Sequence, residues 1–555
     1  MDFKMRKQIK FLTTIAVLSV ITISGCKKSF FDRTPQSAIT IDNYYKSVSE
    51  VQATTNALYS VTWFGWCGKS GWAITDLAAG NGKGSSSDIV NFFNFSVTSG
   101  NSQLESAWNA LFTVVAQANA VINTLPVKVD PGVDKAVVNN ALGEARLWRA
   151  LAYFHLVRTF GPVPIIENSA DYIKDYQVNT APIPDIYKFM VNDLKFAEAN
   201  LTPMIRSGYG TGRLSSGSAS ALLSKVYLYM QDYTNARLEA QKVISSGEFK
   251  LYGTDITSKT YNDLFLTENN NNEESVIALQ WAKTGNYGEG NPQQAAFAFN
   301  GITTTGDGYS LLAPTYDLQD LYQSGDKRRK ATIMLPGDFY PEINKVNGGY
   351  TFPLTANPAD VHAAVKKYVV GSPADNGGFG GRQAAANNTY MMRYSEVYLI
   401  LAEAIMNGAS ASTDGAALSA INKVRNRAGL GDLTIINRNY TVPNPAAAVA
   451  GAPAQTPARL IVDDILNERR RELAFENDFW FDLGRLDGFN TTNHPRAIAL
   501  IAQQDRGGAN NDVVPKRYGN GYVTITNKDF YFLYPAAETN ANPKLLLPPV
   551  PYAFK

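Results

Sequence analysis

Three segments of the chain space their apolar residues three or four positions apart, which is the pattern of an amphipathic helix. They are residues 142–157, 219–245 and 394–428. Each is interpreted as a helix–turn–helix, with small alanines where two helices must approach closely. With residues 103–125 as the partner of 142–157, four helix pairs can form. The positions predicted to face the core include Ala145, Trp148, Ala152, Leu222, Val226, Val397 and Ile421.

The spacing of aromatic, alanine and apolar positions in these segments is similar to that of tetratricopeptide repeats, in a degenerate and interrupted form. Around them lie long stretches without periodicity, namely residues 61–102, 268–274, 281–316 and 437–458. Loops of such length are uncommon in compact domains and are often functional. We therefore expect an all-α dominated fold, in which a tetratricopeptide-like scaffold of helix pairs carries long irregular loops and minor β elements.

The N-terminus has the layout of a bacterial secretory signal. A basic start is followed by an uncharged, largely apolar run of 13 residues, 11–23. This run is too short to span a bilayer, which needs about 20 residues. Ser24 and Gly25 directly before Cys26 resemble the cleavage box of bacterial lipoproteins, which predicts removal of residues 1–25 and acylation of Cys26. An ordinary secreted protein with a chance cysteine is the alternative.

Removal of residues 1–25 changes the charge balance of the chain. The full sequence has 51 basic and 49 acidic residues, and the mature chain keeps 47 and 48, a net charge of −1. Nucleic-acid binding depends on many cations that neutralise phosphates, so this balance argues against it. With Cys26 acylated, Cys67 has no partner for a disulfide within the chain.

Several blocks of the sequence resemble the SusD/RagB family. The segment 392–404 is similar to the block "RYAE-x-x-L-x-x-AEA" of that family, and 421–430 is similar to "IN-x-VR-x-RAGL". Residues 465–476, with 479–485, are similar to "I-x-x-ERR-x-EL-x-FE…R-x-x-D-x-x-R". Two further matches lie nearer the N-terminus, at 149–164 and at Asp32-Arg33-Thr34-Pro35. The blocks span essentially the whole mature chain in the expected order.

The resemblance implies a fold and a function. It implies an outer-membrane lipoprotein of the Bacteroidetes type, anchored by lipid on Cys26 and facing the cell exterior. Its tetratricopeptide-like helices would pack against a SusC-like TonB-dependent transporter, to which it delivers oligosaccharide or polysaccharide. The resemblance implies no catalysis and no cofactor. A peptide ligand, as for some members of the family, stays open as an alternative, and so does a glycan-degrading enzyme.

The resemblance also implies the domain organisation. We expect a signal peptide at 1–25 and a single SusD-like domain at 26–555. This domain would have an N-terminal part at about 26–275 and a C-terminal part at about 276–555, with a loop insertion at 437–458.

Two aromatic stretches are the candidates for ligand binding. Sugar rings present apolar C–H faces that stack on aromatic side chains, while their hydroxyls need polar partners nearby. The predicted residues of the first stretch are Trp66, Trp72, Asp76 and Asn81, and those of the second are Trp281, Asn286 and Tyr287. The alternative is that these tryptophans belong to the core, which is where most tryptophans lie. None of the seven is taken from a family motif.

The remaining chemical motifs are interpreted as structural. The charged run 468–472 is predicted to be a paired, partly solvated helix face that fixes packing, rather than an anion site. The histidines, His155, His362 and His494, are scattered without the spacing of a metal site, and no metal is predicted. Nothing in the sequence selects a pair of carboxylates for glycoside hydrolysis.

Overall fold

The computed structural model describes residues 44–440, 462–504, 506 and 524–554. The predicted lipidation site, Cys26, lies outside these residues, as does nearly all of the predicted insertion 437–458.

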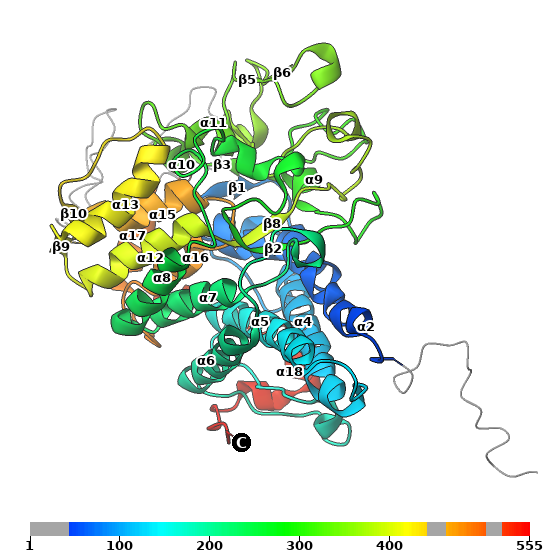
Figure 1. Cartoon of the computed structure of the whole chain (residues 1–555). Coiled ribbons are helices and arrows are strands. Elements are labelled where there is room, and N and C mark those ends of the chain that lie inside the picture. Colours follow the sequence, from blue (N-terminus) through cyan, green and yellow to red (C-terminus); the bar gives the residue numbers. More distant parts are fainter. Residues whose placement is uncertain (1–43, 441–461, 505, 507–523, 555) are drawn as a thin grey trace, which may run out of the picture.

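A continuous array of antiparallel helices forms the lower and left parts of the molecule (Figure 1). In chain order its first members are α4 (Ser102–Lys128), α5 (Lys135–Phe160), α6 (Ile183–Asn200), α7 (Ser216–Tyr229) and α8 (Tyr233–Ser246). Each of these packs against the next. Helix α8 then packs on α12 (Tyr394–Met406), which contacts α13 (Gly415–Arg427) and α15 (Asp464–Leu473). The array therefore skips the intervening residues 247–393, which form most of the loops.

The predicted helix–turn–helix pairs at 219–245 and 394–428 and the partner helix 103–125 are confirmed. The segment 142–157 is helical as predicted, but it lies within one continuous helix, α5, without a turn. The predicted core positions are all buried, among them Trp148 and Ile421 with no exposed surface. Polar side chains cap several helices by accepting a backbone N–H: Asn101 from Gln103 and Asp134 from Ala136. Helix α5 ends at Gly161, whose φ of 75° favours glycine. Helix α6 was not among the predicted helices.

The stretch 61–102, predicted to be irregular, is largely built of short helical turns. It contains η3 (Val61–Trp63), the π-helical turns η4 (Trp66–Ser70) and η5 (Ala73–Leu77), and α3 (Val90–Phe93). Before it lie α2 (Val48–Ala53) and η2 (Asn56–Tyr59). Turns η3 and η4 pack against α4, and η5 packs against α16 (Phe479–Gly484). The prediction of an irregular stretch from its glycine-rich composition was wrong. Packing against the neighbouring helices gives this stretch its regular turns.

The strands are short and, where paired, antiparallel. The pair β2 (Ser275–Leu279) and β8 (Thr389–Arg393) matches Leu279 with Thr389, so the loops after β2 and before β8 leave from the same end. The other pairs are β1 (Gly82–Gly84) with β3 (Leu312–Pro314), β4 (Ile333–Met334) with β7 (Ala364–Val365), β5 (Phe339–Tyr340) with β6 (Tyr350–Thr351), and β10 (Ile436–Asn439) with both β9 (Ala411–Ser412) and β11 (Val462–Asp463).

Short helices complete the C-terminal half and the connections. The α-helices are α9 (Gln293–Phe297), α10 (Tyr316–Gln319), α11 (Arg328–Thr332), α16 (Phe479–Gly484), α17 (Pro495–Ala502) and α18 (Ala536–Ala541). The 3₁₀ turns are η6 (Ser169–Tyr172), η7 (Gly208–Gly210), η8 (Asn262–Phe265), η9 (Thr267–Asn269), η10 (Lys345–Asn347), η11 (Pro358–Asp360), η12 (Pro373–Asn376), η13 (Asn527–Phe530) and η14 (Pro543–Leu546).

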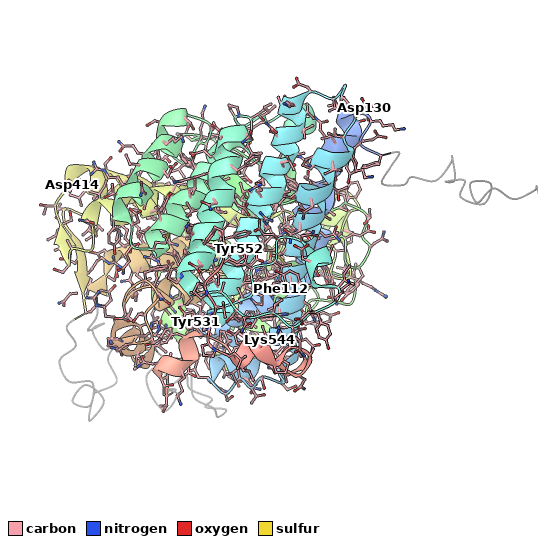
Figure 2. All side chains as sticks on the ribbon, turned by 90° about the horizontal axis from the view of Figure 1, so that it is seen from below. Phe112, Asp130, Asp414, Tyr531, Lys544 and Tyr552 are labelled. Carbon is pink, nitrogen blue, oxygen red and sulfur yellow. The ribbon has the colours of Figure 1, made fainter. Side chains whose placement is uncertain are left out.

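The C-terminal segment crosses the helical array on its lower face (Figure 2). The Tyr552 backbone N–H donates to the Asp185 carboxylate in the first turn of α6 at 2.8 Å. The Lys544 ammonium donates to the Gln177 carbonyl at 2.8 Å. These contacts hold the end of the chain on the scaffold, away from the loops at the upper right of Figure 1.

Helix α15 carries the charged run 468–472 through the core, which corrects the prediction of a partly solvated face. Glu468, Arg469 and Glu472 have no exposed surface. Arg469 pairs with Asp482 at 2.7 Å, and Glu472 pairs with Arg393 at 2.7 Å. The run is structural, as predicted, but it is buried because acids and bases from several other elements surround it.

Candidate functional site

The four predicted residues of the first aromatic stretch lie in the core. Trp66, Trp72, Asp76 and Asn81 have no exposed surface. The Trp66 ring packs 4.7 Å from the His155 ring, and because the residue has no exposed surface, no face of the indole is open to a ligand. This corrects the prediction that these residues line a ligand surface. The physical reason is that η4 packs between α4 and α9, while η5 packs against α16, α3 and β1.

Asp76 and Asn81 connect the N-terminal turns to α15. The Asp76 carboxylate accepts from the Asn81 amide and from the Phe475 backbone N–H, both at 2.9 Å. The Asn81 side-chain oxygen accepts from Arg470 Nε at 2.7 Å. Burial raises the pKa of Asp76 to about 6, although these donors oppose the shift. Their polar groups are satisfied within the protein, so both residues act as structural links.

The second aromatic stretch reaches the surface. Tyr287 is 71% exposed and Asn286 is exposed, whereas Trp281 is only 5% exposed. The Trp281 indole N–H donates to Thr389 Oγ1 at 3.0 Å, which fixes the ring beneath the surface. The structure therefore places two of the three predicted residues where a ligand can reach them, and places Trp281 as support beneath them.

Two further aromatic side chains join Tyr287 at the surface. The half-buried Phe64 packs edge-on against Tyr287, with ring centroids 5.0 Å apart, and rests on Trp281 at 6.4 Å. Phe379 is 45% exposed, and the Lys283 ammonium lies 5.8 Å from its ring centroid. We call Phe64, Lys283, Asn286, Tyr287 and Phe379 the aromatic loop surface. It is built by the turn after η3, the loop between β2 and α9, and the loop before β8.

Buried amides hold the two main loops of this surface together. The backbone of Asn291 exchanges two hydrogen bonds with that of Ala385, at 2.8 and 3.0 Å. The Gln294 side chain accepts from the Val370 N–H at 2.6 Å and donates to the Gly371 carbonyl at 2.9 Å. The loop that carries Phe379 is therefore anchored near both of its ends on the start of α9. A rigid anchor of this kind preorganises a binding surface on loops.

An open depression of about 720 Å³ lies on neighbouring loops. Tyr309, which is 49% exposed, lines it together with Asn300, Asp307 and Asn357. Asp307 accepts from the backbone N–H of Gln383 at 2.9 Å, which joins the depression to the loop of Phe379. Its volume is in the range of ligand sites, and its lining combines an aromatic ring with polar groups.

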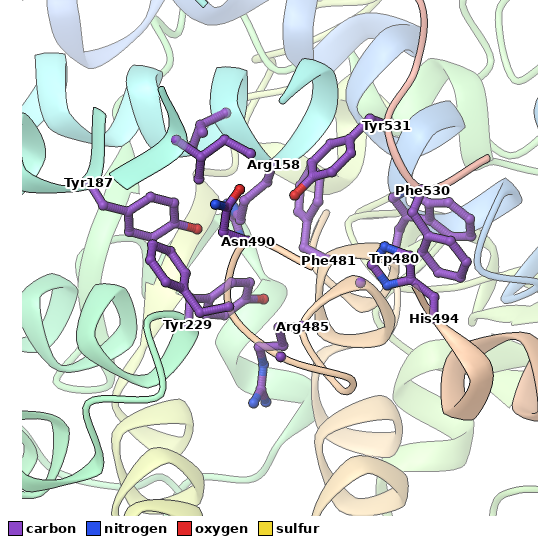
Figure 3. Close-up of a pocket in the computed structure, with 15 residues that line it drawn as sticks. Arg158, Tyr187, Tyr229, Trp480, Phe481, Arg485, Asn490, His494, Phe530 and Tyr531 are labelled. Carbon is purple, nitrogen blue, oxygen red and sulfur yellow. The ribbon is translucent and has the colours of Figure 1, made fainter. Parts of the chain in front are cut away.

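Two other cavities are poorer candidates. The cavity enclosed by Arg158, Tyr187, Tyr229 and His494 has a volume of about 40 Å³ (Figure 3). A water molecule needs about 10–15 Å³, so this cavity has room for a few waters but is too small for a sugar ring. A cleft of about 420 Å³ lies between α2 and the start of α5, over an ion pair of Arg213 with Glu144. Among the described residues that line it, none is aromatic.

The sequence contained signals for the residues that were missed. Phe379 stands between two pairs of glycines, 377–378 and 380–381, so an apolar ring occurs in a run that cannot form a packed element. Phe64 precedes Gly65 and lies within the first aromatic stretch, in which two tryptophans were predicted to bind the ligand. Tyr309 follows Gly308. In this chain, an aromatic residue next to glycine indicates an exposed ring better than a tryptophan does.

Comparison with known proteins gives the family. Residues 273–549 match the model of the SusD family, and residues 30–228 match a model described as starch-binding associating with outer membrane. The chain is 31% identical to a SusD-like protein of Bacteroides ovatus over 99% of both chains. It is 26% identical to SusD-like protein P2 of Formosa agariphila, over 88% of this chain and 93% of that one.

Solved structures agree with this assignment. A crystal structure determined with xylogluco-oligosaccharide has a TM-score of 0.78 and 29% identity, covering 91% of this chain and 99% of that one. A laminarin-binding SusD-like protein has a TM-score of 0.65 and 25% identity, covering 90% of this chain and 98% of that one. The helical scaffold and the family blocks thus agree with both comparisons, and the chain belongs to the SusD/RagB family.

Proposed function

We propose that this protein captures an oligosaccharide or polysaccharide on the aromatic loop surface, without chemical change. The observation that carries the proposal is the exposure of Tyr287 and Phe379 on loops that buried amides hold in place. Exposed aromatic rings expose apolar surface to water, and a stacked sugar ring covers it. The proposal is supported by relatives described as binding laminarin or as crystallised with xylogluco-oligosaccharide.

The ligand is then delivered to a SusC-like TonB-dependent transporter in the outer membrane. In this proposal the mature chain is one SusD-like domain, held at the cell exterior by lipid on Cys26. The cleavage box before Cys26 supports the anchor. The family model that is described as associating with the outer membrane supports the location. The helical array forms the lower and left parts of the molecule, away from the loops at the upper right (Figure 1), and in this proposal its outer face contacts the transporter.

A binding screen tests this function. The purified full chain is titrated calorimetrically with a panel of neutral and acidic oligosaccharides and with a matched panel of peptides. Saturable binding of one glycan class, without product release, is the expected result. Saturable binding of peptides alone would show that the ligand is a peptide and not a glycan. Release of shorter products would indicate an enzyme.

Replacing Gln294 by alanine is expected to weaken oligosaccharide binding by about 5-fold, which corresponds to about 1 kcal/mol for the lost hydrogen bonds. Gln294 is buried and its side chain bonds to the backbone of Val370 and Gly371, so it acts by positioning the loop of Phe379. Calorimetry measures the affinity, and hydrogen exchange of residues 371–385 reports the loosened loop. Unchanged exchange together with unchanged affinity would show that the amide anchor does not position this loop.

A further inference from the structure

The acidic and basic side chains beside the aromatic loop surface differ in how many partners they have within the protein. Its neighbouring acids, Glu289 and Asp307, are occupied by donors of the loops. Glu289 accepts from the Thr284 hydroxyl at 2.7 Å and from the Asn286 amide at 3.1 Å. Asp307 accepts from the Thr305 hydroxyl at 2.6 Å, besides the Gln383 N–H. These hydrogen bonds use Oε2 of Glu289 and both oxygens of Asp307, so the two carboxylates help to shape the loops.

The cations of the same loops are free by comparison. Lys283 and Arg382 are both exposed, and within the part of the chain that the structure describes neither forms an ion pair. Lys283 instead holds its ammonium 5.8 Å from the Phe379 ring centroid. By contrast, Lys69 on the neighbouring turn η4 forms an ion pair with Asp88 at 3.0 Å.

The two free cations lie on adjoining loops. The position of a Cβ on Gly285, two residues after Lys283, is 3.5 Å from the Gly380 carbonyl oxygen, and Gly380 is two residues before Arg382. The loop segments that carry the cations therefore meet beside Phe379. A guanidinium matches a planar carboxylate or a sulfate with paired N–H donors, and an ammonium adds a point charge.

We propose that the glycan bound at the aromatic loop surface carries an anionic substituent, which Lys283 and Arg382 contact while the sugar ring stacks on Tyr287 or Phe379. The inference rests on the proposed function, because it names the ligand class of the same site. The shared chemistry is a carboxylate or sulfate oxygen, supplied either by a uronic acid or by a sulfate ester.

Matched pairs of probes test the inference on the full chain. One arm compares uronic-acid oligosaccharides with the same oligosaccharides after reduction of the carboxyl groups, and the other compares sulfated with desulfated oligosaccharides. We expect tighter binding of the anionic member in one arm, which names its source, and an affinity that falls as salt is raised. Lys283→Gln and R382Q are each expected to weaken that binding about 5–10-fold, while K174Q, at another exposed lysine, leaves it unchanged.

The outcomes separate this inference from the proposed function. If the charged and neutral members of both arms bind equally well, and Y287A weakens the binding of all of them, the inference of an anionic ligand is wrong. The proposed glycan site is then still supported. If no glycan of either arm and no neutral glycan binds, the proposed function fails, and the inference fails with it.

Discussion

Replacing Glu472 by glutamine is expected to lower the free energy of unfolding by about 3–5 kcal/mol, the usual cost of removing one partner from a buried ion pair. Glu472 has no exposed surface and contacts three arginines. Its distance is 2.7 Å to Arg393 and 3.1 Å to Arg328, and it also pairs with Arg427. Glutamine keeps the shape but leaves the arginine charges without compensation. Urea unfolding followed by circular dichroism measures the loss.

The pH dependence gives a second readout of the same substitution. Burial opposes ionisation of Glu472, but Arg427, Arg393 and Arg328 outweigh it and hold the pKa of this carboxyl well below its usual range. A group with a lowered folded-state pKa stabilises the protein above its unfolded pKa, about 4.3, and this contribution is lost as pH falls further. The difference in stability between E472Q and the native protein should therefore narrow below pH of about 4.

The control for this prediction is the same substitution at an exposed acid. Glu268 in η9 is exposed, and Glu268→Gln is expected to change stability by less than about 0.5 kcal/mol. A loss of less than about 1 kcal/mol for E472Q would contradict the account of α15 as a buried ionic support. It would mean that the arginines find other partners or water when the carboxylate is removed.

Replacing Tyr287 by alanine is expected to weaken glycan binding about 30-fold, or by about 2 kcal/mol, as for a central aromatic contact of an interface. Tyr287 is 71% exposed, so its removal creates no core cavity and stability should hardly change. Its ring supplies stacking area and packs edge-on against Phe64. Calorimetric titration with the glycan that the native protein binds measures the loss.

A tyrosine elsewhere on the surface serves as the control for Tyr287→Ala. Tyr176 is 63% exposed and lies in the segment after η6, which contacts the C-terminal tail. Y176A should leave glycan affinity unchanged. Equal glycan affinities of Y287A and the native protein would show that the aromatic loop surface is not the ligand site.

The sequence was sufficient for the scaffold because helix periodicity is a local property. The apolar stripe of α5 and the repeated stripes of α7, α8, α12 and α13 lie where the spacing places them. Helix α6 was missed although Ile186, Met190 and Leu194 follow the same spacing and are buried. The spacing of these residues is therefore as clear a helix signal as that of the other helices.

The site was harder to predict because exposure is a tertiary property. Trp72 and Tyr287 both occur in glycine-rich stretches, yet Trp72 packs against Phe297 at 5.6 Å while Tyr287 remains exposed. The difference depends on which elements cover each stretch. The anchors of the Phe379 loop join residues about 75–95 positions apart, such as Gln294 with Val370, and no local pattern reveals such a pairing.

A crystal structure of the protein with the tightest-binding oligosaccharide of the screen tests the central claim most directly. The account predicts a sugar ring stacked on Tyr287 or Phe379, with further units reaching towards Tyr309. An oligosaccharide bound in the cleft of Arg213 and Glu144 instead, with Tyr287 and Phe379 unoccupied, would contradict it.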